Sequence, residues 1–168
     1  MALSSEHQHF LIVKQGLVPA IFNFVLNGAL AWLILRHNDF LTLWGEGATG
    51  PDLLITGFLL AFLSCVIVTP LVTRQIRSGE IPLLGAIEAA APGMHTRSLM
   101  ARASLLGVLG IVFGALPTVG LLNWFGVEPM TVGWFVTFKA IWTGLLAAAI
   151  TPVIAWWALR AASCEATR

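Results

Sequence analysis

The stretch TVGWFVTFKAIWTGLLAAAITPVIAWWALR, residues 131–160, decides the fold of this chain. Its thirty residues contain one interior charge, Lys139, before the closing Arg160. About 20 apolar residues are enough for a helix to cross the hydrocarbon core of a bilayer. The stretch therefore predicts a transmembrane helix, over residues 131–159, with length to spare for tilt.

Three further apolar stretches predict spans of the same kind, at about 10–35, 53–72 and 99–124. The 168-residue chain is 58% hydrophobic and 10% charged, whereas about a quarter of the residues of a soluble domain are charged. A helix satisfies its backbone hydrogen bonds internally, as the bilayer core requires. We therefore expect an all-α membrane protein in which residues 1–168 form a single integral membrane domain with four transmembrane helices.

Arginines gather around the connection between the second and third expected spans. The charged residues there are Arg74, Arg77, Arg97 and Arg102, against Glu80 and Glu88. Because cytoplasmic loops carry an excess of Lys and Arg, we expect two in-out-in hairpins with both termini in the cytoplasm. The apolar residues of 81–94, between Pro82 and Pro92, further predict a short helix that lies on the membrane surface.

The two halves of the chain, about 10–77 and 99–161, share markers that predict an internal repeat. In each half a tryptophan precedes a span that ends in Thr-Pro: Trp44 with Thr69-Pro70, and Trp124 with Thr151-Pro152. Halves of one orientation would be parallel repeats, related by an axis along the membrane normal. The alternative is that these residues arose independently, because Trp favours membrane interfaces and Pro is frequent in membrane helices.

Each half also resembles small two-helix bacterial membrane proteins of unknown function. The residues that carry the resemblance are Phe40, Trp44, Pro70 and Arg74 in the first half and Trp124, Pro152 and Arg160 in the second. The resemblance implies a tandem duplication and a bacterial inner-membrane location. It implies no activity.

Lys139 is the main candidate for a functional residue, because an ionised side chain at the centre of a span costs about 2.5–3.5 kcal/mol. Two interpretations remain open. In the first, the long stem of the lysine carries its ammonium outward to the headgroups. In the second, the ammonium faces a cavity with Asn23, Asn27 and Thr143, and these four are the candidate substrate-binding residues. The asparagines could instead only tie helices together.

Small residues and prolines predict how the helices pack and bend. The candidate packing residues are Gly107, Gly110 and Gly114 in the third span and Gly144 in the fourth. Small faces allow the close approach on which helix association in lipid depends. Each span also holds one proline that is expected to kink it, and these are Pro19, Pro70, Pro117 and Pro152.

The sequence contains no recognisable catalytic or cofactor motif. Its four histidines lie outside the expected spans, and no carboxylate falls within one. Neither a phosphate-binding loop nor a spaced set of metal ligands is present. We therefore expect no enzyme, no cofactor and no metal site. The net charge of +1 provides no basic surface for nucleic acid.

Two classes of function remain open. One is a small-solute permease or channel component that uses Lys139. The other is a non-catalytic scaffold or accessory subunit, whose small-residue faces bind other membrane proteins or further copies of the chain within the lipid bilayer. The direction of the Lys139 side chain separates them. A lysine that points into the bundle favours the permease, and one that points to lipid or headgroups favours the scaffold.

Overall fold

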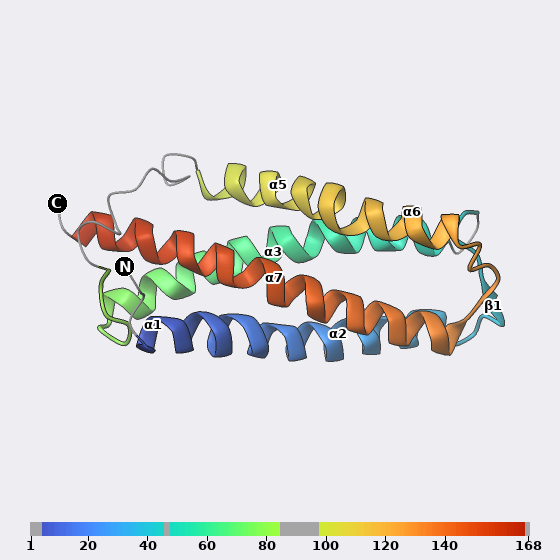
Figure 1. Ribbon diagram of the computed structural model, residues 1–168, viewed down its shortest axis with the longest axis horizontal. Coiled ribbons are helices and arrows are strands. Elements are labelled where there is room, and N and C mark those ends of the chain that lie inside the picture. The colour runs from blue at the N-terminus through green and yellow to red at the C-terminus, as the bar shows by residue number, and fades with distance from the viewer. Residues whose placement is uncertain (1–4, 46–47, 85–97, 167–168) are drawn as a thin grey trace.

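The computed structural model describes residues 5–45, 48–84 and 98–166 as four long helical rods (Figure 1). The first rod is continuous from α1 (Ser5–His9) through the π-helical segment η1 (Phe10–Leu17) to α2 (Val18–Leu35). The second rod is α3 (Thr49–Arg77). The third consists of α5 (Leu99–Leu109), the π-helical segment η3 (Gly110–Ala115) and α6 (Leu116–Trp124), and the fourth is α7 (Val132–Ala166).

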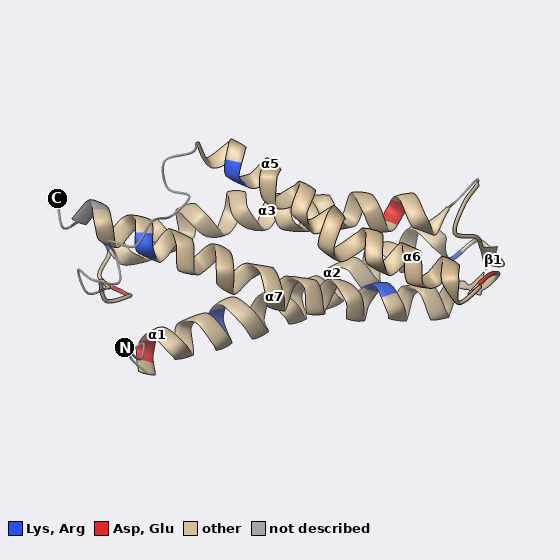
Figure 2. Ribbon diagram, turned by 45° about the horizontal axis from the view of Figure 1, so that its top comes forward, with Lys and Arg blue, Asp and Glu red and all other residues tan. Residues whose placement is uncertain are grey.

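Each of the four rods is long and apolar enough to cross a membrane. The prediction of an all-α protein with four membrane-length helices is therefore confirmed. Charged residues lie mainly toward the two ends of the rods, and most of their length carries none (Figure 2). This distribution fits a bilayer, in which the hydrocarbon core penalises charge and the headgroup regions accept it.

The rods pack side by side in the order first rod, α7, α3, third rod (Figure 1). The start of α1 and the end of α7 lie at one end of this bundle (Figure 1), which we call the terminal end. At the opposite end, called here the strand end, β1 (Phe40–Leu41) pairs antiparallel with β2 (Met130–Thr131). The two connections at the strand end are thereby joined to each other, and α7 and α3 occupy the middle of the bundle.

Apolar side chains close the strand end of the bundle. One buried cluster there joins both connections to three of the rods, and its members are Leu41, Leu43, Leu53, Val119, Leu122, Met130, Val132 and Phe135. The backbone N–H of Leu43 also donates a hydrogen bond to the carboxylate of Glu128, on the other connection. Residues 40–43 are therefore held against the second half of the chain.

A second buried cluster closes the terminal end. It consists of Phe10, Val72, Ile76, Ile81, Leu84, Ala155, Ala158, Leu159 and Ala162. The N–H of Leu84 donates to the hydroxyl of Ser163 at 3.1 Å, so the segment that follows α3 is attached to the end of α7. Pro82 and Leu84, where the surface helix was expected to begin, are not helical, and residues 85–94 of that prediction lie outside the described residues.

Two of the four prolines follow π-helical segments. Before Pro19, the N–H of Val18 donates to the carbonyl of Val13, five residues back, and before Pro117 the N–H of Leu116 donates to Ile111 in the same way. Proline has no N–H for the usual bond four residues back, and a π turn is one way in which a helix accommodates the change. The other two prolines, Pro70 and Pro152, lie inside the α-helices α3 and α7.

Glycine brings α3 and the third rod into backbone contact. A β-carbon on Gly110 would collide with the carbonyl oxygen of Gly57, and one on Gly107 would lie 2.6 Å from the ring of Phe58. On α7, a β-carbon on Gly144 would lie 3.2 Å from the carbonyl oxygen of Ala20 in the first rod. Gly114 faces Leu146 of α7, with 3.1 Å available to a β-carbon. All four glycines selected from the sequence thus face a neighbouring rod.

The internal repeat stays a prediction. The two strands occupy different places relative to the tryptophans that marked the repeat, because β1 precedes Trp44 whereas β2 follows Trp124. Their pairing is therefore a contact between unlike positions of the two halves.

We predict that Gly110→Ala destabilises the bundle by about 1–3 kcal/mol, the usual cost of adding a methyl group where no space exists. The free energy of unfolding is measured by titrating the protein in detergent micelles with sodium dodecyl sulfate. The matched control is Gly120→Ala in α6, where an added β-carbon meets no atom within 4 Å. The control should be neutral or stabilising by up to about 1 kcal/mol. Equal effects of the two changes would contradict the close contact with Gly57.

Candidate functional site

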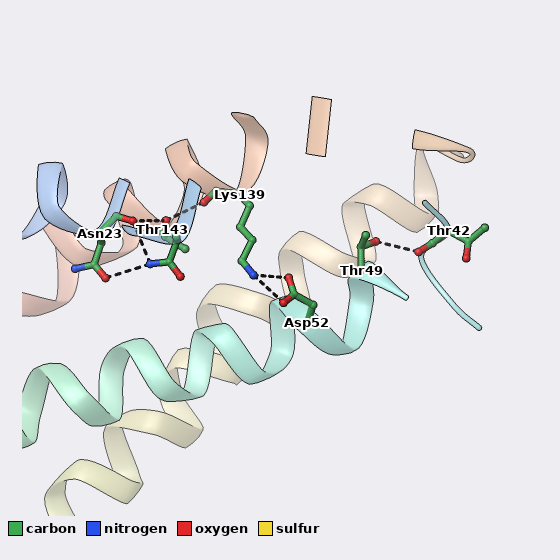
Figure 3. A network of polar contacts seen from close by, with 7 residues as sticks. Asn23, Thr42, Thr49, Asp52, Lys139 and Thr143 are labelled. Carbon is green, nitrogen blue, oxygen red and sulfur yellow. Dashed lines mark hydrogen bonds and ion pairs between the residues drawn. The ribbon is translucent and has the colours of Figure 1, made fainter. Parts of the chain in front are cut away.

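The start of α3 is fixed by the connection that precedes it. The N–H groups of Thr49 and Gly50 donate to the carbonyls of Thr42 and Leu43, each at 3.0 Å. The hydroxyl of Thr49 adds a bond of 3.1 Å to the same carbonyl of Thr42 (Figure 3). The first N–H groups of a helix have no partner within it, so these loop carbonyls replace a side-chain cap and set where α3 begins.

Asp52 therefore lies in the first turn of α3. A carboxylate there is favoured by the partial positive charge of a helix N-terminus. Pro51 beside it costs little, because a proline in the first turn removes an N–H that has no helical partner. The helix begins four residues before the expected span at 53–72 and takes in the carboxylate that the sequence analysis left in the loop.

Lys139 points into the bundle and forms an ion pair with Asp52 (Figure 3). Its Nζ donates to both carboxylate oxygens, at 2.7 Å and 2.6 Å. The lysine side chain is 8% exposed and that of the aspartate 40% exposed. Side chains on a helix tilt toward its N-terminus, and α7 begins at the strand end. The stem of Lys139 thus extends toward the strand end, and its ammonium ends on a carboxylate within the protein.

The two asparagines do not contact this ammonium through any hydrogen bond that the structure records. The amide of Asn23 donates to the carbonyl of Pro19 at 2.9 Å, and that of Asn27 donates to the carbonyl of Asn23 at 3.1 Å. A second contact of 3.4 Å joins Asn27 to the side-chain oxygen of Asn23. The asparagine side chains are therefore engaged along their own helix, one turn back.

Thr143 links α7 to the first rod one turn away from Lys139. Its hydroxyl lies 2.9 Å from the carbonyl oxygen of Lys139, in its own helix, and 3.3 Å from that of Asn23 in α2 (Figure 3). The threonine is fully buried. Of the four residues selected from the sequence, Lys139, Thr143 and Asn23 thus lie close together, but the contact with Asn23 is made through its backbone.

A pocket of about 220 Å³ adjoins the ion pair, between the first rod, the start of α3 and α7. Its lining consists of Ala31, Ile34, Leu35, Ala48, Thr49, Asp52, Phe135 and Lys139. A cavity that holds one water needs at least about 10–15 Å³ of such volume, so the pocket has room for several waters or a small solute. An ion pair at the edge of an otherwise apolar pocket can orient a small polar solute through a few directed hydrogen bonds.

Asp52 is the residue that the sequence analysis missed. Two features in the sequence indicate that a helix starts before it: a proline at a first-turn position and an acidic residue directly after that proline. Hydropathy alone places the boundary at Leu53, because charged and small residues lower the mean hydropathy of the first turn. Pro51 and Asp52 together with the hydropathy of the residues that follow predict a span that includes Asp52.

Among the described residues, no group of three or more His, Cys, Asp or Glu side chains is placed to hold a metal ion. The chain matches no protein-family model, no curated protein and no solved structure. The geometry of Lys139 and Asp52 is therefore the basis for a functional proposal.

We predict that the two single substitutions of the ion pair differ in their cost. Asp52→Asn leaves a buried ammonium without a counter-charge and should destabilise the protein by about 1–3 kcal/mol, less than a fully buried pair because Asp52 is part exposed. Lys139→Met should cost less, since the remaining carboxylate can reach solvent. Unfolding free energies in detergent micelles measure both changes, with Asp39→Asn on the exposed loop as the neutral control.

The double substitution tests whether the two effects arise from one interaction. Asp52→Asn combined with Lys139→Met removes both charges and should be more stable than Asp52→Asn alone. A double-mutant cycle reports the coupling energy directly. Additive effects, with a coupling below about 0.5 kcal/mol, would mean that the pair is not formed in the membrane-embedded protein.

Proposed function

We propose that the chain is a small-solute permease or channel component that binds its solute in the pocket beside Lys139. The observation that carries the proposal is the inward direction of this lysine, with its side chain 8% exposed and its partner bordering an open pocket. Ionisable residues within membrane spans are rare and usually serve the passage of a solute or ion. A lysine that faced only lipid headgroups would have favoured the scaffold.

The ion pair narrows the class of solute. The ammonium has three donors and lies within hydrogen-bond distance of the two carboxylate oxygens of Asp52, so at least one donor is left for a solute. The carboxylate, 40% exposed, retains lone pairs that can accept a hydrogen bond from the same solute. Because the pair is neutral as a whole, a simple anion gains attraction from Lys139 and suffers repulsion from Asp52. The pocket therefore favours a neutral or zwitterionic solute that carries both a donor and an acceptor.

Beyond the pocket, the side chains along α7 are closely packed. Toward the terminal end, α7 presents Thr143, Ala147 and Thr151, all of them at most 1% exposed. Passage of a solute along α7 requires that the helices move apart or that a further copy or subunit completes the path. The first and third rods each contain an internal π segment followed by a proline, and irregular helical backbone of this kind is used by membrane transporters at their sites and hinges.

A scaffold or accessory subunit is the second candidate function. It is favoured by the exposure of the first rod. In the most apolar 18-residue stretch of this rod, only 6% of the residues are buried by the rest of the chain. Lipid or another membrane protein can cover such a surface. The small-residue faces give this candidate less support, because Gly107, Gly110, Gly114 and Gly144 all lie against neighbouring rods of the same chain.

We further propose that the protein lies in a bacterial inner membrane with the terminal end in the cytoplasm. This orientation is supported by Arg74 and Arg77 in the last turn of α3, Arg102 in the first turn of α5, and Arg160 near the end of α7. Cytoplasmic ends of spans are enriched in such residues. The Lys139 pocket then faces the periplasm, and each half of the chain forms an in-out-in hairpin, with the repeat as its origin.

A swelling assay on liposomes that contain the purified protein tests the proposed permease. The probes are glycine, urea, glycerol and sodium acetate, which represent zwitterionic, neutral and anionic solutes. We expect faster entry of at least one of the first three than in protein-free liposomes, and no acceleration of acetate. Ala48→Leu fills the pocket while leaving the ion pair in place, and should reduce the accelerated entry at least about tenfold, as loss of a binding position does.

The matched control for the pocket is Ala101→Leu, which adds the same side chain at an exposed position of α5. The control should transport like the unmodified protein. Protein-containing liposomes that admit all four probes no faster than empty ones would contradict the proposal. Equal rates for the two leucine variants would remove the pocket from the path even if transport is observed.

Thiol labelling of intact cells tests the proposed orientation. In a background with Cys65 and Cys164 replaced by alanine, cysteines are introduced at Ser78 and at Asn38, both exposed and at opposite ends of the bundle. An impermeant maleimide should label the cysteine at 38 from outside and the cysteine at 78 only after the membrane is opened. The reverse pattern would show that the terminal end is periplasmic.

A further inference from the structure

A second pocket lies at the terminal end of α3. The Lys139 pocket, with Asp52, lies at the opposite end of the same helix. Its volume is about 320 Å³, and it lies between the end of α3 and the start of α5. The residues that line it are Thr69, Pro70, Thr73, Arg74, Arg77, Leu99 and Arg102. Three of these seven are arginines, and none of the described lining residues carries a carboxylate. The pocket therefore combines a concentrated positive charge with apolar surface.

One donor on a residue that lines this pocket has no partner in the described part of the chain. The Nε of Arg102 is buried, and no hydrogen bond to it is present among the described residues. A buried donor without an acceptor is destabilising, and more so when the group is charged. The α5 N-terminus adds partial positive charge at the same place, although Ser98 caps it through the N–H of Ala101. An anionic acceptor is the group that would satisfy this environment.

The position of the pocket along the bundle identifies a source of such acceptors. α3 has 29 residues and is therefore about 43 Å long, whereas the hydrocarbon core of a bilayer is about 30 Å thick. The last turn of α3 and the first turn of α5 thus project into the headgroup region, where lipid phosphates lie. Pro70 and Leu99 provide the apolar part of the lining, which a lipid's glycerol and acyl groups can contact.

We propose that this pocket binds the phosphate group of an anionic phospholipid. Arginine is suited to this task, because its planar fork of donors matches the oxygens of a phosphate in pairs. Basic pockets between helices at one membrane face are a recognised way to hold such headgroups. The proposal rests on residues other than those of the Lys139 pocket, so it stands or fails independently of the proposed transport.

Lipid binding to the full-length protein tests the proposal by native mass spectrometry in a mild detergent. The probes are phosphatidylglycerol, which is anionic, and phosphatidylcholine, which has the same phosphate but no net charge. We expect one molecule of phosphatidylglycerol to bind more tightly than phosphatidylcholine. Arg74→Gln with Arg102→Gln should weaken the binding of phosphatidylglycerol about thirtyfold, the product of two surface-arginine contributions. Arg74→Lys with Arg102→Lys retains the charge and should lose less.

The matched control removes two cations elsewhere, by Lys14→Gln with Arg36→Gln, both exposed and outside this pocket. Its affinity for phosphatidylglycerol should stay within about twofold of the unmodified value. Equal losses in the control and the arginine variant would overturn the proposal, because they would show an effect of net charge alone. Displacement of the lipid by millimolar inorganic phosphate would also overturn it, by assigning the site to free phosphate. The lysine variant supplies the same comparison if the glutamine variant does not fold.

Discussion

The contact between Lys139 and Asp52 is the constraint on which the arrangement of the two central helices depends. An ammonium within a membrane span needs a counter-charge, and the loss of hydration is offset only when that partner is close and well directed. Both oxygens of Asp52 meet the ammonium, at 2.7 Å and 2.6 Å. The contact requires that α3 begins before Asp52, that the connection at 42–43 accepts its first N–H groups, and that α7 faces α3.

Much of the fold is predictable from sequence, because a residue's preference for the bilayer core depends mainly on its own side chain. Hydropathy can therefore be summed along the chain without knowledge of tertiary contacts. The four membrane-length helices follow from this one-dimensional signal. The glycines of the third rod also indicate a close contact between helices, because small residues let two backbones approach each other. Gly57, which contacts Gly110 from α3, is not predictable as a packing residue. It is a single glycine in an apolar span, without the regular spacing that marks the glycines of the third rod.

The candidate site is less predictable, because its geometry depends on which acceptor lies nearest. Asn23 and Asn27, four residues apart, look in sequence like a polar pair that faces Lys139. In the structure their amides donate to carbonyls one turn back in the same helix, at 2.9 Å and 3.1 Å. A local carbonyl is always in reach along a helix, whereas a contact across the bundle depends on helix rotation. The partner of Lys139 is instead Asp52, in the first turn of α3.

The two pockets lie at opposite ends of one central pair of helices, and each is completed by a different outer rod. α3 and α7 are joined by the ion pair near the strand end and by Val72, Ile76, Ala155 and Leu159 near the terminal end. The first rod contributes Ala31, Ile34 and Leu35 to the Lys139 pocket, and α5 contributes Leu99 and Arg102 to the arginine pocket. Because the first rod packs mainly on α7 and α5 mainly on α3, a ligand in each pocket contacts a different outer rod as well as the central pair. The helix that lines both pockets is α3, which bears Asp52 in its first turn and Arg74 and Arg77 in its last.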